Sequence, residues 1–112
     1  MDRKELVRQY KETPRPAGVY RIEHRASGRT LLGSSPDAPA MLNRVRAQLR
    51  MKGHPNRVLQ KDWEVDGPDG FVFEVVDVLT PTDSPDYDPA EDLRMLESLW
   101  VEKLGLTAES RY

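Results

Sequence analysis

The spacing of apolar residues along this chain changes from every second position to every third or fourth. Residues 17–25 alternate, with Tyr20 and Ile22 on one side, so they predict a β-strand. Residues 26–28 form a turn signal, and residues 29–34 predict a second strand that completes a β-hairpin. Helical spacing begins directly after this hairpin, so we expect the sheet and its covering helices to alternate along the chain.

Four segments have the spacing of amphipathic helices. They cover residues 2–12, 37–53, 56–63 and 89–104. Asp37 and Asn56 can cap the N-termini of the second and third helices, and Gly53 can end the second. The expected buried stripe of the last helix consists of Leu93, Leu96, Trp100 and Leu104.

The segment from Phe71 to Leu79 is nearly continuous in apolar and β-branched residues. Such a run is typical of a central strand that is buried on both faces. The chain therefore predicts an α+β fold, a small three-stranded antiparallel sheet flanked by helices, in the order α-β-β-α-α-β-α. At 112 residues we expect one domain, with an N-terminal helix and connector (1–15), a core (16–104) and a tail (105–112).

Composition excludes several classes of protein. The chain has no cysteine, which rules out disulfide frameworks and thiolate metal sites. The charged N-terminus and the lack of a long apolar run favour a cytoplasmic protein. Residues 1–61 carry 14 basic and 5 acidic side chains, whereas residues 62–112 carry 3 basic and 14 acidic ones. Either a basic face meets a polyanion, or the two halves neutralise each other in the fold.

One series of short motifs carries chemistry. Gly18-Val19-Tyr20 lies on the first predicted strand and Leu31-Leu32-Gly33 on the second. Three further motifs follow the second strand along the chain: Lys52-Gly53-His54-Pro55-Asn56, then Leu59-Gln60-Lys61-Asp62-Trp63, and, within the last helix, Leu96-Glu97-Ser98-Leu99-Trp100. In order and spacing this series resembles the GIY-YIG nuclease superfamily over about residues 16–104.

The resemblance implies a phosphodiesterase that acts on nucleic acid with Mg²⁺ or Mn²⁺. It places Tyr20 at the first catalytic tyrosine, His54 at the histidine after the helix, and Glu97 at the metal-binding glutamate. Other family positions are lost, because Leu31 replaces a tyrosine, Met41 an arginine and Val45 a histidine, and the C-terminal asparagine has no counterpart. Arg44, three residues after Met41, is the candidate replacement for the arginine that contacts phosphate.

Each surviving residue also has a structural interpretation. Tyr20 could be a strand residue that packs its ring. His54 could hydrogen-bond the backbone of a helix corner. Glu97 lies beside an apolar stripe, where a metal, Arg44 or partial exposure could compensate its charge.

Nucleic-acid binding depends on a different set of residues. Six basic side chains occur between residues 41 and 61 without an acidic one among them: Arg44, Arg46, Arg50, Lys52, Arg57 and Lys61. They suit contacts to DNA phosphates. The sequence thus predicts a DNA-binding domain with weak or no metal-dependent cleavage. The alternative is a non-enzymatic interaction module whose acidic segment, residues 80–92, contacts a basic partner.

Overall fold

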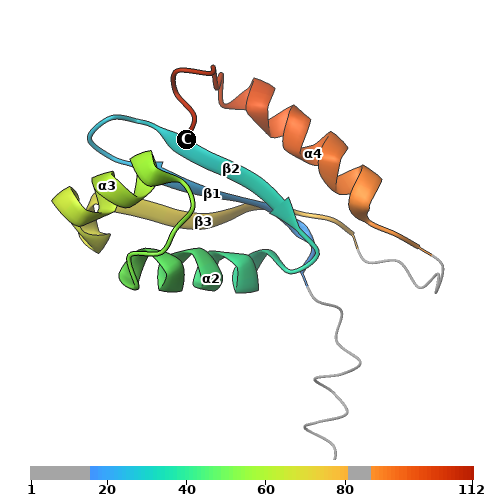
Figure 1. The fold of residues 1–112 in the computed structure, drawn as a ribbon. Coiled ribbons are helices and arrows are strands. Elements are labelled where there is room, and N and C mark those ends of the chain that lie inside the picture. The colour runs from blue at the N-terminus through green and yellow to red at the C-terminus, as the bar shows by residue number, and fades with distance from the viewer. Residues whose placement is uncertain (1–15, 81–86) are drawn as a thin grey trace, which may run out of the picture.

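A computed structural model describes residues 16–80 and 87–112, so the predicted helix at residues 2–12 and most of the proline-rich loop lie outside the described residues. The sheet contains β1 (Gly18–His24), β2 (Thr30–Ser35) and β3 (Phe71–Val78), all antiparallel, in the order β2-β1-β3 (Figure 1). The predicted α+β architecture and its three-stranded antiparallel sheet are confirmed.

The central strand, however, is β1 and not the apolar strand β3 as predicted. Val19, Tyr20 and Ile22 of β1 are all buried, so both faces of this strand are covered although its sequence alternates. Only Phe71 of β3 is buried, because β3 is an edge strand and its other residues remain half-buried or exposed. Strand position depends on which strands pair, and a local apolar run does not encode that choice.

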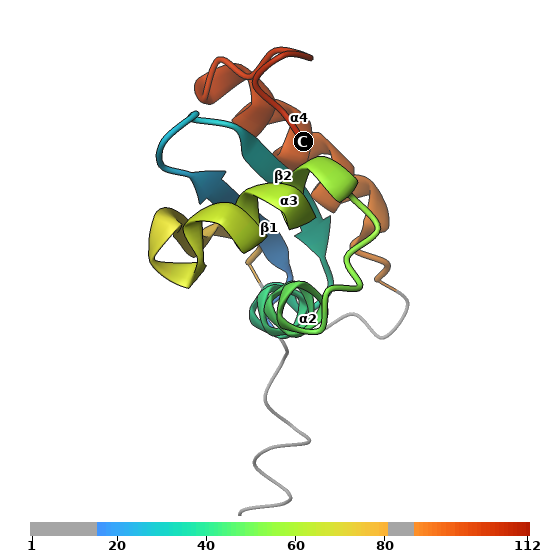
Figure 2. The same cartoon turned by 60° about the vertical axis from the view of Figure 1, so that its left-hand side comes forward.

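The helices are α2 (Ala38–Arg50), α3 (Arg57–Asp66) and α4 (Ala90–Lys103). A short 3₁₀ turn at Pro68–Gly70 connects α3 to β3. In Figure 2, α2 and α3 lie on one side of the sheet and α4 lies beyond β2. None of these helices, within residues 16–80 and 87–112, has the length and hydrophobicity that a bilayer-spanning helix needs.

The main core lies between the sheet and the pair α2–α3. Tyr20 and Ile22 point into it from β1, together with Leu42 and Leu49 of α2 and Trp63 of α3. The side chains of Val19 and Leu32 point to the opposite face of the sheet, where α4 packs. The buried residue of α4 is Leu93, whereas the other predicted stripe residues, Leu96, Trp100 and Leu104, are half-buried. The last helix therefore covers the sheet less completely than its apolar spacing predicts.

Helix capping follows the sequence at both predicted N-termini. The Asp37 side chain accepts a hydrogen bond from the Ala40 amide, and the Asn56 side chain accepts one from the Leu59 amide. At the end of α2 the prediction for Gly53 is wrong by one residue. Lys52, with φ of 60°, takes the left-handed position, and the Gly53 amide donates to the Gln48 carbonyl.

The C-terminal tail packs back onto the sheet. Arg111 bridges the backbone of Thr30 in parallel orientation, and the Tyr112 amide donates to the Thr30 carbonyl. The Tyr112 ring packs against the core, and its hydroxyl donates to Asp62 of α3 at 2.6 Å. Residues 110–112 of the predicted tail are therefore a structural part of the β2 edge.

Candidate functional site

The two motif glycines position Tyr20. Gly33 lies opposite Tyr20 in the β1–β2 register, and a Cβ atom at this position would lie 2.6 Å from the Tyr20 Cζ atom. Gly18 approaches β3 so closely that a Cβ atom there would overlap the Asp77 carbonyl oxygen. The first glycine is thus required for strand pairing, and the second leaves room for the Tyr20 ring to lie across β2.

Tyr20 and Glu97 interact electrostatically although they lie far apart in the sequence. The Tyr20 ring is almost buried, and burial raises the pKa of the Tyr20 phenol, with a smaller contribution from the negative charge of Glu97. The charge of Glu97 on α4 thus acts electrostatically on the phenol of β1. At neutral pH the Tyr20 phenol is protonated, so it can donate a hydrogen bond to an oxygen.

Both groups lack protein partners within residues 16–80 and 87–112. The Tyr20 hydroxyl has no hydrogen bond there, and the half-buried Glu97 carboxylate has neither a hydrogen bond nor an ion pair. In particular, Arg44 does not compensate the Glu97 charge by an ion pair in this described part. A carboxylate in this position is available to a ligand from outside the chain.

The Glu97 carboxylate is an oxygen ligand, which suits Mg²⁺ or Mn²⁺ better than a softer metal. Among the described residues, no three His, Cys, Asp or Glu side chains form a group that could hold an ion by themselves. Mg²⁺ commonly uses one or two carboxylates and takes its remaining ligands from water and phosphate oxygens. A single free glutamate therefore fits such an ion when a phosphate is bound.

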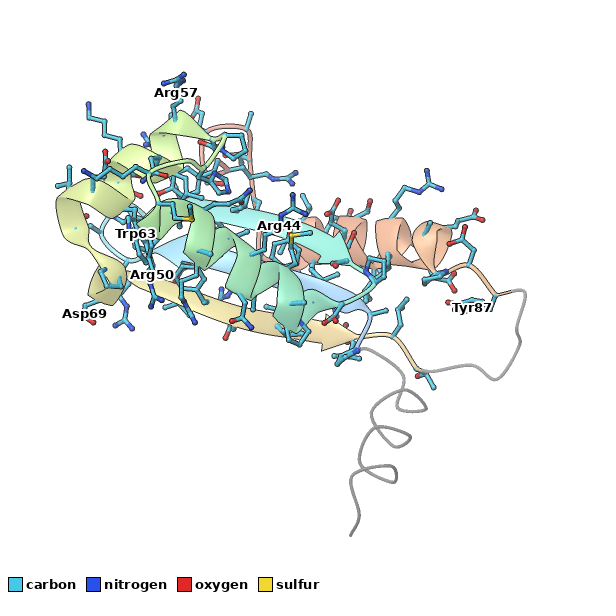
Figure 3. The ribbon with its side chains drawn as sticks, turned by 60° about the horizontal axis from the view of Figure 1, so that its bottom comes forward. Arg44, Arg50, Arg57, Trp63, Asp69 and Tyr87 are labelled. Atoms are coloured by element: carbon cyan, nitrogen blue, oxygen red, sulfur yellow. The ribbon has the colours of Figure 1, made fainter. Side chains whose placement is uncertain are left out.

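The three positions at which the resemblance expects a tyrosine, an arginine and a histidine carry apolar side chains that pack in or against the core. Val45 is buried in the main core, and Leu31 and Met41 pack against it. No polar group replaces them at these three positions. The side chain of Arg44, by contrast, is exposed and leaves α2 in a different direction from Arg50 (Figure 3).

His54 lies in the corner between α2 and α3. Its amide donates to the Gln60 side chain at 3.1 Å, and its ring Nδ1 accepts a hydrogen bond from the Asn56 amide at 3.0 Å. Burial lowers the pKa of the His54 imidazole. The structure shows no contact from His54 to Tyr20, Glu97 or Arg44 among the described residues. Of the four predicted catalytic residues, only Tyr20 and Glu97 are linked, by the electrostatic effect of Glu97 on the phenol.

The six predicted DNA-binding residues divide into three groups. The Arg46 guanidinium stacks 4.6 Å from the Phe73 ring centroid on the β3 side of α2, and Arg50 lies one turn further along the same side. Arg44 is about 200° around the helix from Arg46, which places it on the β2 side. Lys52, Arg57 and Lys61 line a hollow at the α2–α3 corner, and Lys52 also lines a neighbouring hollow together with Arg50. These residues therefore do not form one continuous stripe.

Three residues shape this region through contacts that the sequence does not predict. Asn56 and Gln60 fix the His54 ring and backbone, and Tyr112 holds α3 through Asp62. The Asn56 signal is present in the sequence, since it follows His54 by two residues and caps α3. The contacts of Gln60 and Tyr112 depend on the tertiary fold and have no local sequence signal.

Comparison with solved structures identifies the fold. The catalytic domain of the homing endonuclease I-TevI superposes with a TM-score of 0.66 at 18% identity, over 86% of this chain and 95% of that one. A single-substitution mutant of that domain, from the intron endonuclease I-TevI, gives 0.67 at 18% identity, over 87% and 91%. No family model and no curated protein matches the sequence. I-TevI is a GIY-YIG endonuclease, so the chain has the GIY-YIG nuclease-like fold that its motif order predicts.

Proposed function

We propose that this chain is a DNA-binding domain of the GIY-YIG nuclease type with slow, metal-dependent phosphodiester hydrolysis at Tyr20 and Glu97. The observation that carries the proposal is the electrostatic effect of Glu97 on the Tyr20 phenol, together with the lack of a hydrogen bond or ion pair to either group in the described residues. The protonated phenol can donate to a phosphate oxygen or to the attacking water.

Glu97 would hold the divalent cation. When bound, the cation supplies positive charge that offsets the negative charge of the phosphate and favours ionisation of the nearby phenol. Arg44 is the candidate phosphate contact, since it is exposed and unpaired within the described residues. The missing polar groups at positions 31, 41 and 45 are expected to lower the rate about a hundred- to a thousand-fold relative to a complete site.

Cleavage of single-stranded or nicked DNA with Mg²⁺ or Mn²⁺ tests this proposal. We expect Glu97→Ala to abolish cleavage, whereas Glu102→Ala, an exposed glutamate on the same helix, keeps the wild-type rate. Cleavage that survives Glu97→Ala would assign the activity to a contaminant or to another site.

The second candidate function is a non-catalytic protein-interaction module. Two observations favour it: hydrocarbon at Leu31, Met41 and Val45, and exposed acidic side chains at the start of α4. The described acidic residues of this segment are Asp88, Glu91 and Asp92.

DNA affinity separates the two candidates. Binding through Arg46 and Arg50 should weaken steeply with salt, and replacing both by alanine should reduce the slope of log K against log salt by up to about 2. No measurable affinity at low salt would favour the interaction module.

A further inference from the structure

A hollow of about 460 Å³ lies at the corner between α2 and α3. Its charged lining residues are Lys52, Arg57, Lys61 and Glu64, and His54 forms part of the wall. We propose that this hollow is a subsite for one phosphate group of a nucleic-acid strand, in which neutral His54 donates a hydrogen bond from Nε2. The inference rests on the proposed DNA-binding function and adds the place and manner of one contact.

The tautomer of His54 follows from its partner. A backbone amide can only donate, so Nδ1 of His54 must accept the hydrogen bond from the Asn56 amide. In the neutral imidazole the proton is then on Nε2, which makes this atom a donor. Burial lowers the pKa of the ring and keeps it neutral at pH 7. His54 is therefore arranged to donate to an anion through Nε2. Because Nε2 carries the proton and Nδ1 already accepts a hydrogen bond, neither nitrogen is available as a base.

The backbone around His54 is held in place by a buried amide side chain. Gln60 accepts from the His54 amide through Oε1, and its Nε2 donates to the Leu49 carbonyl at 3.0 Å. This side chain joins the end of α2, the corner and α3. The donor is thus positioned before any ligand binds, which lowers the entropic cost of binding.

The charge of the hollow favours an anion. Three cations face one carboxylate, Glu64, and none of the three cations forms an ion pair with a described residue. Lys52 occupies a left-handed backbone position, with φ of 60°, where glycine would be less strained. Lysine at this place costs stability and adds a positive charge to the hollow.

The phosphate in this hollow is not the one that reacts. Neither Tyr20 nor Glu97 lines the hollow, and its residues come from a different pair of elements. The subsite would therefore contact a neighbouring phosphate of the same strand. Such a contact sets position and affinity without sequence preference.

Nuclear magnetic resonance of the full chain tests the inference. We expect the His54 ring nitrogens to show the Nε2-protonated neutral tautomer, and inorganic phosphate to shift them without protonating Nδ1. Lys52→Gly and Lys61→Ala should each weaken binding of a single-stranded oligonucleotide about three- to tenfold at low salt and reduce the salt slope by about 0.7. Arg94→Ala, an exposed cation on α4, is the control and should change neither.

An oligonucleotide with and without a 5′-phosphate distinguishes a terminal phosphate from an internal diester. If Lys61→Ala removes an affinity advantage of the phosphorylated strand, the subsite takes the terminal group; equal losses for both strands assign it an internal one. Unchanged DNA affinity in both lysine variants would overturn the subsite while leaving DNA binding intact. A phosphate-induced shift of His54 without any DNA affinity would support the anion site and contradict the proposed function.

Discussion

Tyr20 can take its position because Gly33, its partner on the neighbouring strand β2, has no side chain. Its ring occupies the space that a Cβ atom at Gly33 would need, and the negative charge of Glu97 raises the pKa of its phenol. The motif glycine is thus a packing requirement of the tyrosine, which explains why Gly33 accompanies Tyr20 although the tyrosine expected at Leu31 is missing.

Gly33→Ala should displace the Tyr20 ring. Inserting a methyl group into packed space costs about 1–3 kcal/mol, with the lower value if the ring swings outward. We expect a lower urea midpoint and a Tyr20 pKa closer to its ordinary value, since the ring becomes more exposed. Gly53→Ala is the matched control, because nothing lies within 4 Å of a Cβ atom there. Equal midpoints for wild type and Gly33→Ala would contradict the packing argument.

The Glu97 charge can be tested on the phenol itself. Glu97 raises the pKa of Tyr20, so Glu97→Gln should lower it while burial still keeps it above 10.0. The Tyr20 signal can be followed in a pH titration by nuclear magnetic resonance. Glu102→Gln should leave the Tyr20 pKa unchanged. An unaltered Tyr20 titration in Glu97→Gln would show that the Glu97 charge does not act on the phenol.

At the scale of elements, the corner between α2 and α3 combines a strained backbone at the C-terminus of α2 with a side-chain cap at the N-terminus of α3. α2 ends in a Schellman motif whose left-handed residue is Lys52, and Asn56 caps α3 four residues later. The hairpin and α3 are also linked, because His24 hydrogen-bonds Ser27 at 2.7 Å and also contacts Asp66 of α3. The helix end and the Asn56 cap form the corner at the proposed phosphate subsite, whereas the His24 contacts hold the opposite end of α3.

The helix end and the helix start should respond in opposite directions to mutation. Lys52→Gly relieves a left-handed non-glycine residue and should raise the free energy of unfolding by about 0.5–1 kcal/mol. Asn56→Ala removes the cap of α3 and should lower it by about 1 kcal/mol. Urea denaturation of both variants provides the measurement. A destabilised Lys52→Gly would mean that the lysine side chain has contacts that outweigh its strain.

At the scale of the whole molecule, buried phenols make the stability depend on alkaline pH. Burial and its hydrogen bond to Asp62 raise the pKa of Tyr112 far above the ordinary value, and burial raises that of Tyr20. In the unfolded chain both phenols ionise near pH 10, before the folded ones do. The folded state therefore holds more protons, and its stability is full below pH 10 and falls as pH rises beyond that value.

Denaturation by urea at pH 8, 9.5 and 10.5 should show this decrease. Tyr112→Phe should lower stability at pH 8 by about 1 kcal/mol through the lost hydrogen bond. The same variant should also flatten the decline above pH 10, since one of the two phenols is gone. A variant with the wild-type slope would show that Tyr112 ionises in the folded tail as it does in the unfolded chain.

The sequence by itself determines the strands and helices of the described residues and their order along the chain. Apolar spacing fixes which face of α2 and of α3 is buried, and Asp37 and Asn56 specify where these two helices begin. These features are local, because they depend on backbone geometry and on neighbours three or four residues away. The same local series of motifs suffices to indicate the fold, including Gly18 and Gly33.

Tertiary structure decides what depends on contacts between distant residues. It places β1 in the centre, because strand pairing and not local apolarity chooses the middle strand. It lets the charge of Glu97 act on Tyr20 across more than half of the chain, divides the basic residues between two sides of α2 and a hollow, and docks Tyr112 on Asp62. Long-range pairing has no period in the sequence, so these features become visible only once the chain is folded.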